Sequence, residues 1–375
     1  MAMSEMNYKQ YLTDNVLKFW LDNAIDKDNG GIFTCLDEKG VIYGEEKSVW
    51  FQGRALWTFS TAYNTIEKRP EYLEVAKTIY EFLPKCTDTD GRMYFIVTHD
   101  GRPIQKRRYY FSETFAAIGC AEYYIATGDK KVWEDAEKYF ERAYKIFKNP
   151  NLTTPKFYPE NAPYKALSPV MIMLSTAQEM RKVDKEKYSP IADEMLNELL
   201  YGGYLKEDVL LENVALDGKF ADTPTGRTVN PGHSLEASWF LMEEGVYRKD
   251  NEIIKKALNI VDFSMRRGFD NGAIIAFTDA CGKPPVALEW DMKLWWPQCE
   301  AMIANKYAFS LTGKEKYKNN FDILNEYAFT HFADDKNGEW YGYLHYDGTV
   351  ANTLKGNIFK GPFHIPRMLM ILSRF

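Results

Sequence analysis

Two of the five histidines in this 375-residue chain stand where a predicted helix begins, a position from which a side chain can face a cleft. His233 follows Asn230-Pro231-Gly232, and His364 follows Gly361-Pro362-Phe363. Gly and Pro mark helix starts, and histidine changes its charge near neutral pH. Each of the two is therefore a candidate functional side chain at the mouth of a cleft. The alternative is that each ring only caps its helix and packs against tryptophan.

A charged residue accompanies each of these histidines. Glu236 follows His233 by three positions, and Arg367 follows His364 by three. Residues at this spacing share one face of a helix. Each predicted helix start therefore presents a histidine and a charged group on one side.

Two further segments combine charge with aromatic rings. Residues 288–300 hold three tryptophans and three carboxylates, among them Trp295, Trp296 and Glu300. So many charges and indoles on one helix suggest a functional surface. The alternative is a buried tryptophan-rich helix whose charged residues lie at its solvated start. Arg54 lies among the aromatic residues of 49–57. It is either buried and paired, or it binds an anion or a group of hydroxyls.

Several function classes lack their signature in this chain. The metal-binding pattern H-E-x-x-H, the dinucleotide pattern G-x-G-x-x-G and the phosphate-loop pattern are all absent, so no metal site is predicted. The five cysteines are scattered and form no C-x-x-C pair. A net charge of −6 argues against nucleic acid as a partner, and no stretch is long and apolar enough to span a membrane. We expect a soluble cytoplasmic protein.

A short turn-and-strand element recurs along the chain and indicates repeated units. Its glycines are Gly30, Gly91, Gly272 and Gly338, separated by 61, 181 and 66 residues. Since 181 is about three times 60, a period near 60 residues fits six times into the chain. Asn-Gly and Asp-Gly supply the positive φ angles of tight turns, so each element predicts a β-hairpin.

Helical periodicity fills the sequence between these hairpins and predicts twelve helices, two in each unit. Their ranges are 8–20, 47–67, 70–85, 112–127, 131–148, 168–183, 186–200, 232–247, 250–267, 291–312, 314–331 and 361–373. Six helix pairs joined by hairpins favour an all-α closed ring, the (α/α)6 barrel with its short β-hairpins at one end, over an open solenoid. With no linker in the sequence, we expect residues 1–375 to form a single domain.

Five segments together resemble the N-acylglucosamine 2-epimerase family, which includes the mammalian renin-binding protein. The resemblance runs from Gly30 to Arg367. It rests on Val49-Trp50-Phe51-Gln52-Gly53-Arg54, Phe111-Ser112-Glu113, Asn230 to Ala237, Leu288 to Glu300, and Gly361-Pro362-Phe363-His364-Ile365-Pro366-Arg367. It implies the same barrel, with the site in the central cleft.

The family reaction interconverts N-acetyl-D-glucosamine and N-acetyl-D-mannosamine, an isomerase activity that requires no cofactor. By resemblance, His233 and His364 remove and return the C2 proton on opposite faces of a flat intermediate. The same resemblance implies substrate binding by seven residues: Arg54, Glu113, Glu236, Trp295, Trp296, Glu300 and Arg367. A small amino sugar is then the expected partner, and a homodimer the candidate assembly. Mammalian members are stimulated by ATP that they do not consume, which leaves ATP open as an activator here.

Other readings stay open at the level of sequence. Cellobiose 2-epimerases and aldose–ketose isomerases share the barrel and the histidine pair. An inverting glycoside hydrolase would instead use two carboxylates about 6.5–9.5 Å apart, for which Glu113, Glu236, Asp291 and Glu300 are available. A non-catalytic binding protein would need no acid–base pair at all.

Overall fold

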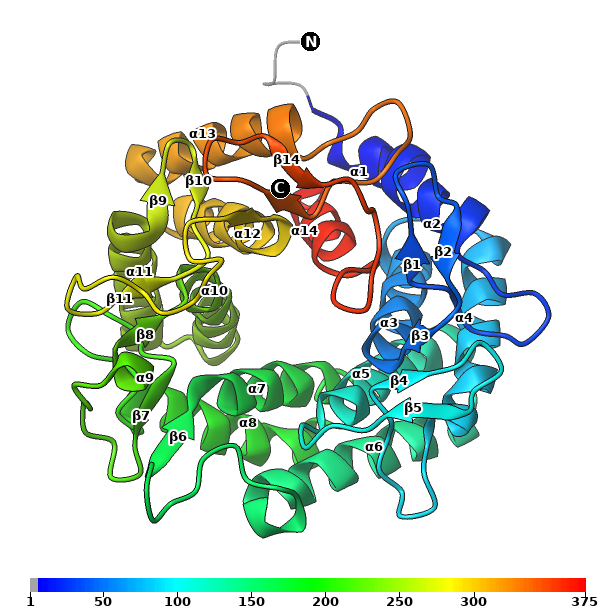
Figure 1. Ribbon diagram of the computed structural model, residues 1–375, viewed down its shortest axis with the longest axis horizontal. Helices are drawn as coiled ribbons and strands as arrows, with labels where there is room; N and C mark the ends of the chain where they lie inside the picture. Colours follow the sequence, from blue (N-terminus) through cyan, green and yellow to red (C-terminus); the bar gives the residue numbers. More distant parts are fainter. Residues whose placement is uncertain (1–5) are drawn as a thin grey trace.

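The computed structural model describes residues 6–375, and its helices form two concentric layers around a central opening (Figure 1). The inner layer consists of α3 (Val49–Thr65), α5 (Phe111–Thr127), α7 (Leu167–Met180), α10 (Pro231–Arg248), α12 (Trp295–Thr312) and α14 (His364–Leu372). Each inner helix packs against the next, and α14 packs against both α12 and α3. These contacts close the ring, so the predicted (α/α)6 barrel is confirmed and the open solenoid is not formed.

The outer layer supplies one helix to each unit. It consists of α4 (Pro70–Phe82), α6 (Lys130–Lys148), α8 (Lys185–Tyr201), α11 (Asn251–Gly268), α13 (Glu315–His331) and a first helix made of α1 (Tyr8–Tyr11), a π-helical turn (Leu12–Leu17) and α2 (Lys18–Asn23). With that first helix counted as one, the described residues contain the twelve predicted barrel helices. A four-residue helix, α9 (Pro224–Arg227), and two short 3-10 turns (Leu83–Cys86 and Pro150–Leu152) lie in the connections.

Inner and outer helices differ in how much of their surface is buried, and their sequences reflect this difference. The first thirteen residues of α5 are all buried, because an inner helix is covered by neighbours on every side except the bore. Outer helix α6 buries one stripe, Val132, Ala136, Tyr139, Phe140 and Ala143. That spacing is the amphipathic pattern of a helix with one face in water.

A close contact between α3 and α5 depends on glycine. A Cβ atom added at Gly53 would lie 2.5 Å from the backbone carbon of Phe115, which is too near for any other residue. The two helices therefore approach closely, and the guanidinium carbon of the next residue, Arg54, lies 3.9 Å from the ring centre of Phe115.

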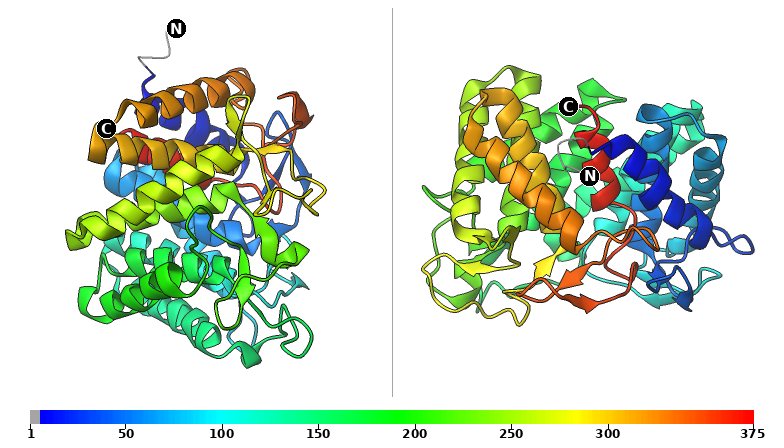
Figure 2. Two further views of the ribbon diagram at one scale, coloured as in Figure 1. Left: turned by 90° about the vertical axis from the view of Figure 1, so that its left-hand side faces the viewer. Right: turned by 90° about the horizontal axis from the view of Figure 1, so that it is seen from above.

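Short antiparallel strands gather at one end of the barrel, as predicted (Figure 2, right). They are β1 (Cys35–Leu36) with β2 (Ile42–Gly44); β3 (Lys47–Ser48), β4 (Ile96–Val97) and β5 (Pro103–Gln105); β6 (Tyr164–Ala166) with β7 (Asn213–Ala215); β8 (Thr228–Val229) with β11 (Thr278–Asp279); β9 (Phe269–Asp270) with β10 (Ala273–Ile274); and β12 (Lys293–Leu294), β13 (Tyr343–Leu344) and β14 (Val350–Asn352). The repeated glycines Gly30, Gly91, Gly272 and Gly338 have φ angles of 84°, 80°, 87° and 85°. Each thus occupies the left-handed conformation that the turn requires.

Two inner helices begin later than the periodicity predicts. Helix α12 starts at Trp295 rather than at 291, and α14 starts at His364 rather than at 361. In both cases a proline, Pro297 or Pro366, is the third residue of the helix. Proline is favoured in the first helical turn and costs about 3 kcal/mol farther inside, which favours the later starts, although α8 does contain Pro190 as its sixth residue. No helix within residues 6–375 is long and apolar enough to cross a membrane.

Candidate active site

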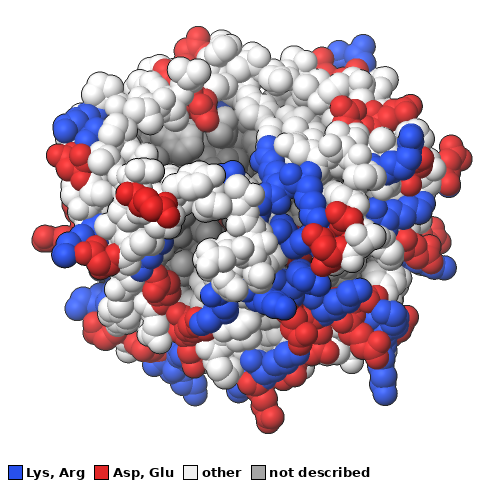
Figure 3. Space-filling model, turned by 60° about the horizontal axis from the view of Figure 1, so that its bottom comes forward, with Lys and Arg blue, Asp and Glu red and all other residues white. Residues whose placement is uncertain are grey.

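The bore of the barrel contains a cavity of about 790 Å³ that is lined mainly by the inner helices. A hollow opens on the surface in Figure 3, with Lys and Arg side chains gathered beside it. Seven of the nine predicted site residues line this cavity, namely Arg54, His233, Glu236, Trp295, Trp296, His364 and Arg367. The fold therefore brings together residues that lie more than 300 positions apart in the chain.

His364 is held by a buried carboxylate. Its Nδ1 atom lies 2.8 Å from Oε1 of Glu300, a residue with no exposed surface, and Trp239 donates its indole N–H to the other oxygen at 2.8 Å. Since a carboxylate only accepts, Nδ1 of His364 carries the hydrogen and Nε2 keeps its lone pair. Burial, followed by the charges of Arg367 and Arg54, holds the pKa of His364 well below its ordinary value. His364 is therefore a neutral base at pH 7.

His233 has the opposite electrostatic setting. Its Nδ1 atom lies 3.0 and 3.1 Å from the two carboxylate oxygens of Glu212, and 29% of its side chain is exposed. Burial opposes a charge on the ring, but the nearby Glu212 carboxylate prevails and raises the pKa of His233 above its ordinary value. His233 is therefore set up to carry a proton that it can donate.

Trp296 lies next to both histidines. Its ring centre is 5.0 Å from that of His233 and 5.8 Å from that of His364. Trp295 meets His364 edge-on at 6.3 Å, and its buried indole N–H has no partner among the described residues. The two tryptophans thus pack against the imidazole rings, and Trp295 offers one hydrogen-bond donor to a ligand.

Two arginines provide positive charge next to the histidines. Nη2 of Arg367 donates to Oε1 of Glu236 at 2.5 Å and to Oε1 of Glu300 at 2.7 Å. Arg54 forms no ion pair within residues 6–375; instead its guanidinium lies over the rings of Phe115 and Phe363, at 3.9 and 4.7 Å. A guanidinium without a carboxylate partner is free to bind an oxygen atom of a ligand.

One group of acidic and imidazole side chains in the described part of the chain has metal-site dimensions. Ligand-type atoms of Glu236, Glu300 and His364 all lie within 4.8 Å of one another. Arg367 already occupies this place with its own positive charge, bound to both carboxylates. A metal ion would have to displace that guanidinium, so the donor set does not fit a resident metal.

Glu113 lies outside the cavity and touches none of the other predicted site residues through a hydrogen bond or ion pair in residues 6–375. It is fully buried and accepts hydrogen bonds from Nε of Arg92 at 2.6 Å and from the backbone N–H of Met93 at 3.0 Å. These contacts attach the second hairpin to α5. Glu300 also does not line the cavity, but it contacts His364 and Arg367, which do.

Sequence reasoning missed Glu212. It precedes β7, and its backbone N–H donates to the carbonyl of Thr228 at 3.1 Å. It lies 21 residues before His233, so no helical or strand spacing relates the two. No sequence signal marks it, because β7 is not one of the turn-and-strand elements that the repeated glycines predict.

Comparison with known proteins supports one family. The model of the N-acylglucosamine 2-epimerase (GlcNAc 2-epimerase) family matches residues 31–363. The chain is 36% identical to N-acylglucosamine 2-epimerase from Bos taurus over 373 residues, which cover 95% of this chain and 87% of the bovine one. It is 27% identical over 398 residues to cellobiose 2-epimerase from Ruminococcus albus, covering 99% and 98% of the two chains.

Comparison with solved structures also finds a cellobiose 2-epimerase. The structure of cellobiose 2-epimerase from Bacillus thermoamylovorans superimposes with a TM-score of 0.85 at 20% identity, covering 98% of each chain. At that identity the likeness concerns the fold alone. The family model over residues 31–363 and the 36% identity to the bovine relative carry the assignment: the chain belongs to the N-acylglucosamine 2-epimerase family, a family of isomerases.

Proposed function

We propose that the enzyme interconverts N-acetyl-D-glucosamine and N-acetyl-D-mannosamine by moving the C2 proton from one face to the other. The observation that carries the proposal is the opposite setting of two histidines across one cavity. The pKa of His364 is lowered and that of His233 is raised. One ring is then a base and the other an acid at the same pH, which is what a two-base epimerisation requires.

The reaction begins with the open-chain aldehyde of the sugar. Nε2 of His364 takes the proton from C2, and the electrons of the C2–H bond form a C1–C2 double bond with negative charge on O1. The unpaired guanidinium of Arg54 and that of Arg367 stabilise this charge. The His233 imidazolium then donates its proton to the opposite face of C2, and the C1 carbonyl reforms.

The reverse reaction uses the same groups with their protons exchanged. His233 then removes the C2 proton and His364 returns one. In either direction, one of the two imidazoles must be protonated and the other neutral. Glu212 and Glu300 act through the histidines and are positioning residues. Each accepts from Nδ1 and thereby directs Nε2 towards the ligand.

Two rivals remain for the same cavity. An aldose–ketose isomerase would deliver the proton to C1 instead of C2 and release a ketose. For an N-acetyl sugar that course is blocked, because C2 carries nitrogen rather than a hydroxyl. An inverting hydrolase would need two free carboxylates, whereas Glu236 and Glu300 are both bound to Arg367.

The test is incubation with N-acetylmannosamine in deuterated water, followed by NMR of the products. We expect N-acetylglucosamine with deuterium at C2 and none at C1. Mannose and cellobiose, compared at equal concentration, should be turned over poorly. Preferential conversion of mannose to fructose, or of cellobiose to its 2-epimer, would refute the N-acetyl substrate and leave the histidine pair in place.

Three further expectations belong to this proposal. We propose a cytoplasmic location, because the five cysteines are unpaired and four of them are buried, as suits a reducing compartment. ATP is proposed only as an activator that is not consumed, which its addition to the assay would test. A homodimer is the proposed assembly, for which light scattering is the measurement.

A further inference from the structure

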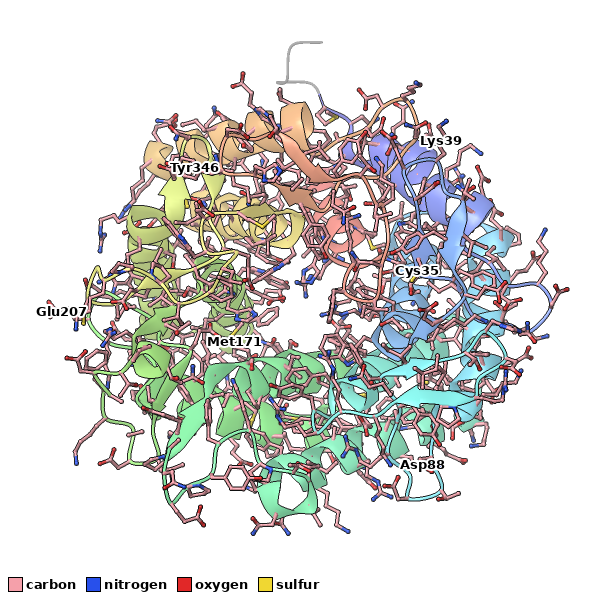
Figure 4. The ribbon with its side chains drawn as sticks, in the orientation of Figure 1. Cys35, Lys39, Asp88, Met171, Glu207 and Tyr346 are labelled. Carbon is pink, nitrogen blue, oxygen red and sulfur yellow. The ribbon has the colours of Figure 1, made fainter. Side chains whose placement is uncertain are left out.

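The wall of the cavity facing the catalytic groups is apolar on α5, whereas on α7 two apolar side chains stand among small polar ones. Helix α12, which carries Trp296, has α5 directly across the six-membered ring, with α7 next to α5. Side chains lining the cavity from these two helices include Phe111, Phe115 and Ile118 of α5 and Met171 and Ile172 of α7. Figure 4 labels Met171 at the edge of the central opening. No charged residue of α5 lines the cavity, and on α7 only Glu179, near the far end of the helix, does so.

Helix positions give the depth of this wall in the cavity. Met171 and Ile172 are the fifth and sixth residues of α7, and Phe115 is the fifth of α5. Arg54 and Glu236 are the sixth residues of α3 and α10. Inner helices of equal rise that start at the same end of the barrel place equal positions at equal depth. The apolar side chains therefore lie at the depth of Arg54 and Glu236, about one turn or less deeper than the two histidines.

The proposed intermediate determines where the substituent on C2 can go. After deprotonation C2 is flat, with one histidine above the plane and the other below. The nitrogen on C2 lies in that plane and must point sideways. One side is filled by Trp296, whose ring centre is 5.0 Å from His233 and 5.8 Å from His364. The other side opens towards α5 and α7.

The polar atoms of an acylated nitrogen also find partners on this wall. Ser168, Met171, Ile172 and Ser175 all line the cavity and follow one face of α7 at helical spacing. A hydroxyl therefore stands one turn before and one turn after the apolar pair. This order suits an amide with a short apolar tail, whereas a hydroxyl on C2 would leave Met171 and Ile172 facing a polar atom.

We propose that Met171, together with Ile172 and Ile118, forms the pocket for the acyl group of an N-acyl amino sugar and sets the chain length that the enzyme accepts. The inference rests on the proposed epimerase function and adds the residues that select its substrate class. Met171 is a specificity residue and takes no part in proton transfer.

The experiment measures kcat/KM for N-acetyl-, N-propanoyl- and N-butanoylmannosamine in the wild type, Met171→Ala and Met171→Phe. Mannose, which has no acyl group, is measured as a competitive inhibitor. Met171→Ala should raise the butanoyl-to-acetyl ratio about tenfold, the effect of a methylene or two in an apolar pocket. Met171→Phe should lower kcat/KM for the N-acyl sugars at least about tenfold and change inhibition by mannose much less.

Met292→Ala is the matched control, because Met292 also lines the cavity but lies just before α12, on the Trp296 side. Its butanoyl-to-acetyl ratio should equal that of the wild type. A ratio unchanged by Met171→Ala in a folded protein, or shifted equally by Met292→Ala, would overturn the acyl pocket while leaving the epimerase intact. A wild type that does not epimerise N-acetylmannosamine would instead overturn the proposed function itself.

Discussion

Gln52 and Gln298 make the same three hydrogen bonds in two different units of the barrel. Gln52 accepts from the backbone N–H of Ile32 at 2.9 Å and donates to the carbonyls of Ile32 and Ser48. Gln298 accepts from the N–H of Ile274 at 2.8 Å and donates to the carbonyls of Ile274 and Leu294. Each glutamine sits in the first turns of an inner helix and attaches the hairpin before it.

Glu113 takes this same place in the second unit, where it accepts from the N–H of Met93. Ile32, Met93 and Ile274 each stand two residues after a repeated turn glycine. The repeat thus explains why Glu113 is absent from the cavity. The family resemblance at Phe111-Ser112-Glu113 points to a residue that attaches a hairpin to α5. Residue type alone could not distinguish this structural contact from substrate binding.

Glu113→Ala should therefore lower stability far more than turnover. The change leaves the largely buried Arg92 without its partner, which costs about 3 kcal/mol in the free energy of unfolding. Urea unfolding measures that loss, and kcat at a temperature where the variant is folded should stay within about threefold of the wild type. Arg92→Met combined with Glu113→Gln copies the neutral arrangement of Gln52 and should recover most of the stability. Folded Glu113→Gln without turnover would place Glu113 in the chemistry instead.

His233→Ala and His364→Ala should each lose at least about a hundredfold in kcat, the low end for one acid–base group. Both side chains line the cavity, and both direct Nε2 away from their carboxylate partners. Circular dichroism and thermal melting establish that each variant is folded. Activity close to the wild type in a folded variant would remove that histidine from the mechanism.

The pH profile of kcat/KM should be bell-shaped, because the reaction needs one proton on the histidine pair. His364 has a lowered pKa and is protonated only below the ordinary value of about 6.5, so activity falls on the acid side there. His233 has a raised pKa and loses its proton only above that value, so activity falls on the alkaline side there. Both directions of the reaction should give the same profile. A single limb would contradict the two-histidine assignment.

Glu212→Gln separates the two limbs. The amide can still accept from Nδ1 of His233, but it no longer supplies the negative charge that raises the pKa of that ring. The alkaline limb should therefore move to lower pH, while the acid limb, set by His364, stays in place. Initial rates across pH 5–9 measure both limbs. A purely structural role for Glu212 would scale the whole profile without moving either limb.

Periodicity and turn chemistry predicted most of this fold, and seven of the nine site residues proposed from the helix starts, the aromatic segments and the family resemblance line one cavity. Helix ranges were reliable because each inner or outer helix is long and its apolar spacing is regular. The starts of α12 and α14 were wrong because proline at the third position outweighs apolar spacing. Glu212 could not be found at all, since its partnership with His233 depends on the residue before β7 meeting the first turn of α10, which happens only in the folded barrel.

Removal of divalent metal should leave the enzyme unchanged. Within residues 6–375, Glu236, Glu300 and His364 form the one cluster of suitable size, and Arg367 donates to both of its carboxylates at 2.5 and 2.7 Å. A cation entering this cluster would repel the guanidinium and take the Nδ1 partner of His364. Dialysis against EDTA should therefore alter neither kcat nor the melting temperature, and excess Zn²⁺ should inhibit if it has any effect. Activity lost on dialysis and restored by a divalent ion would show that Arg367 does not hold this place in the working enzyme.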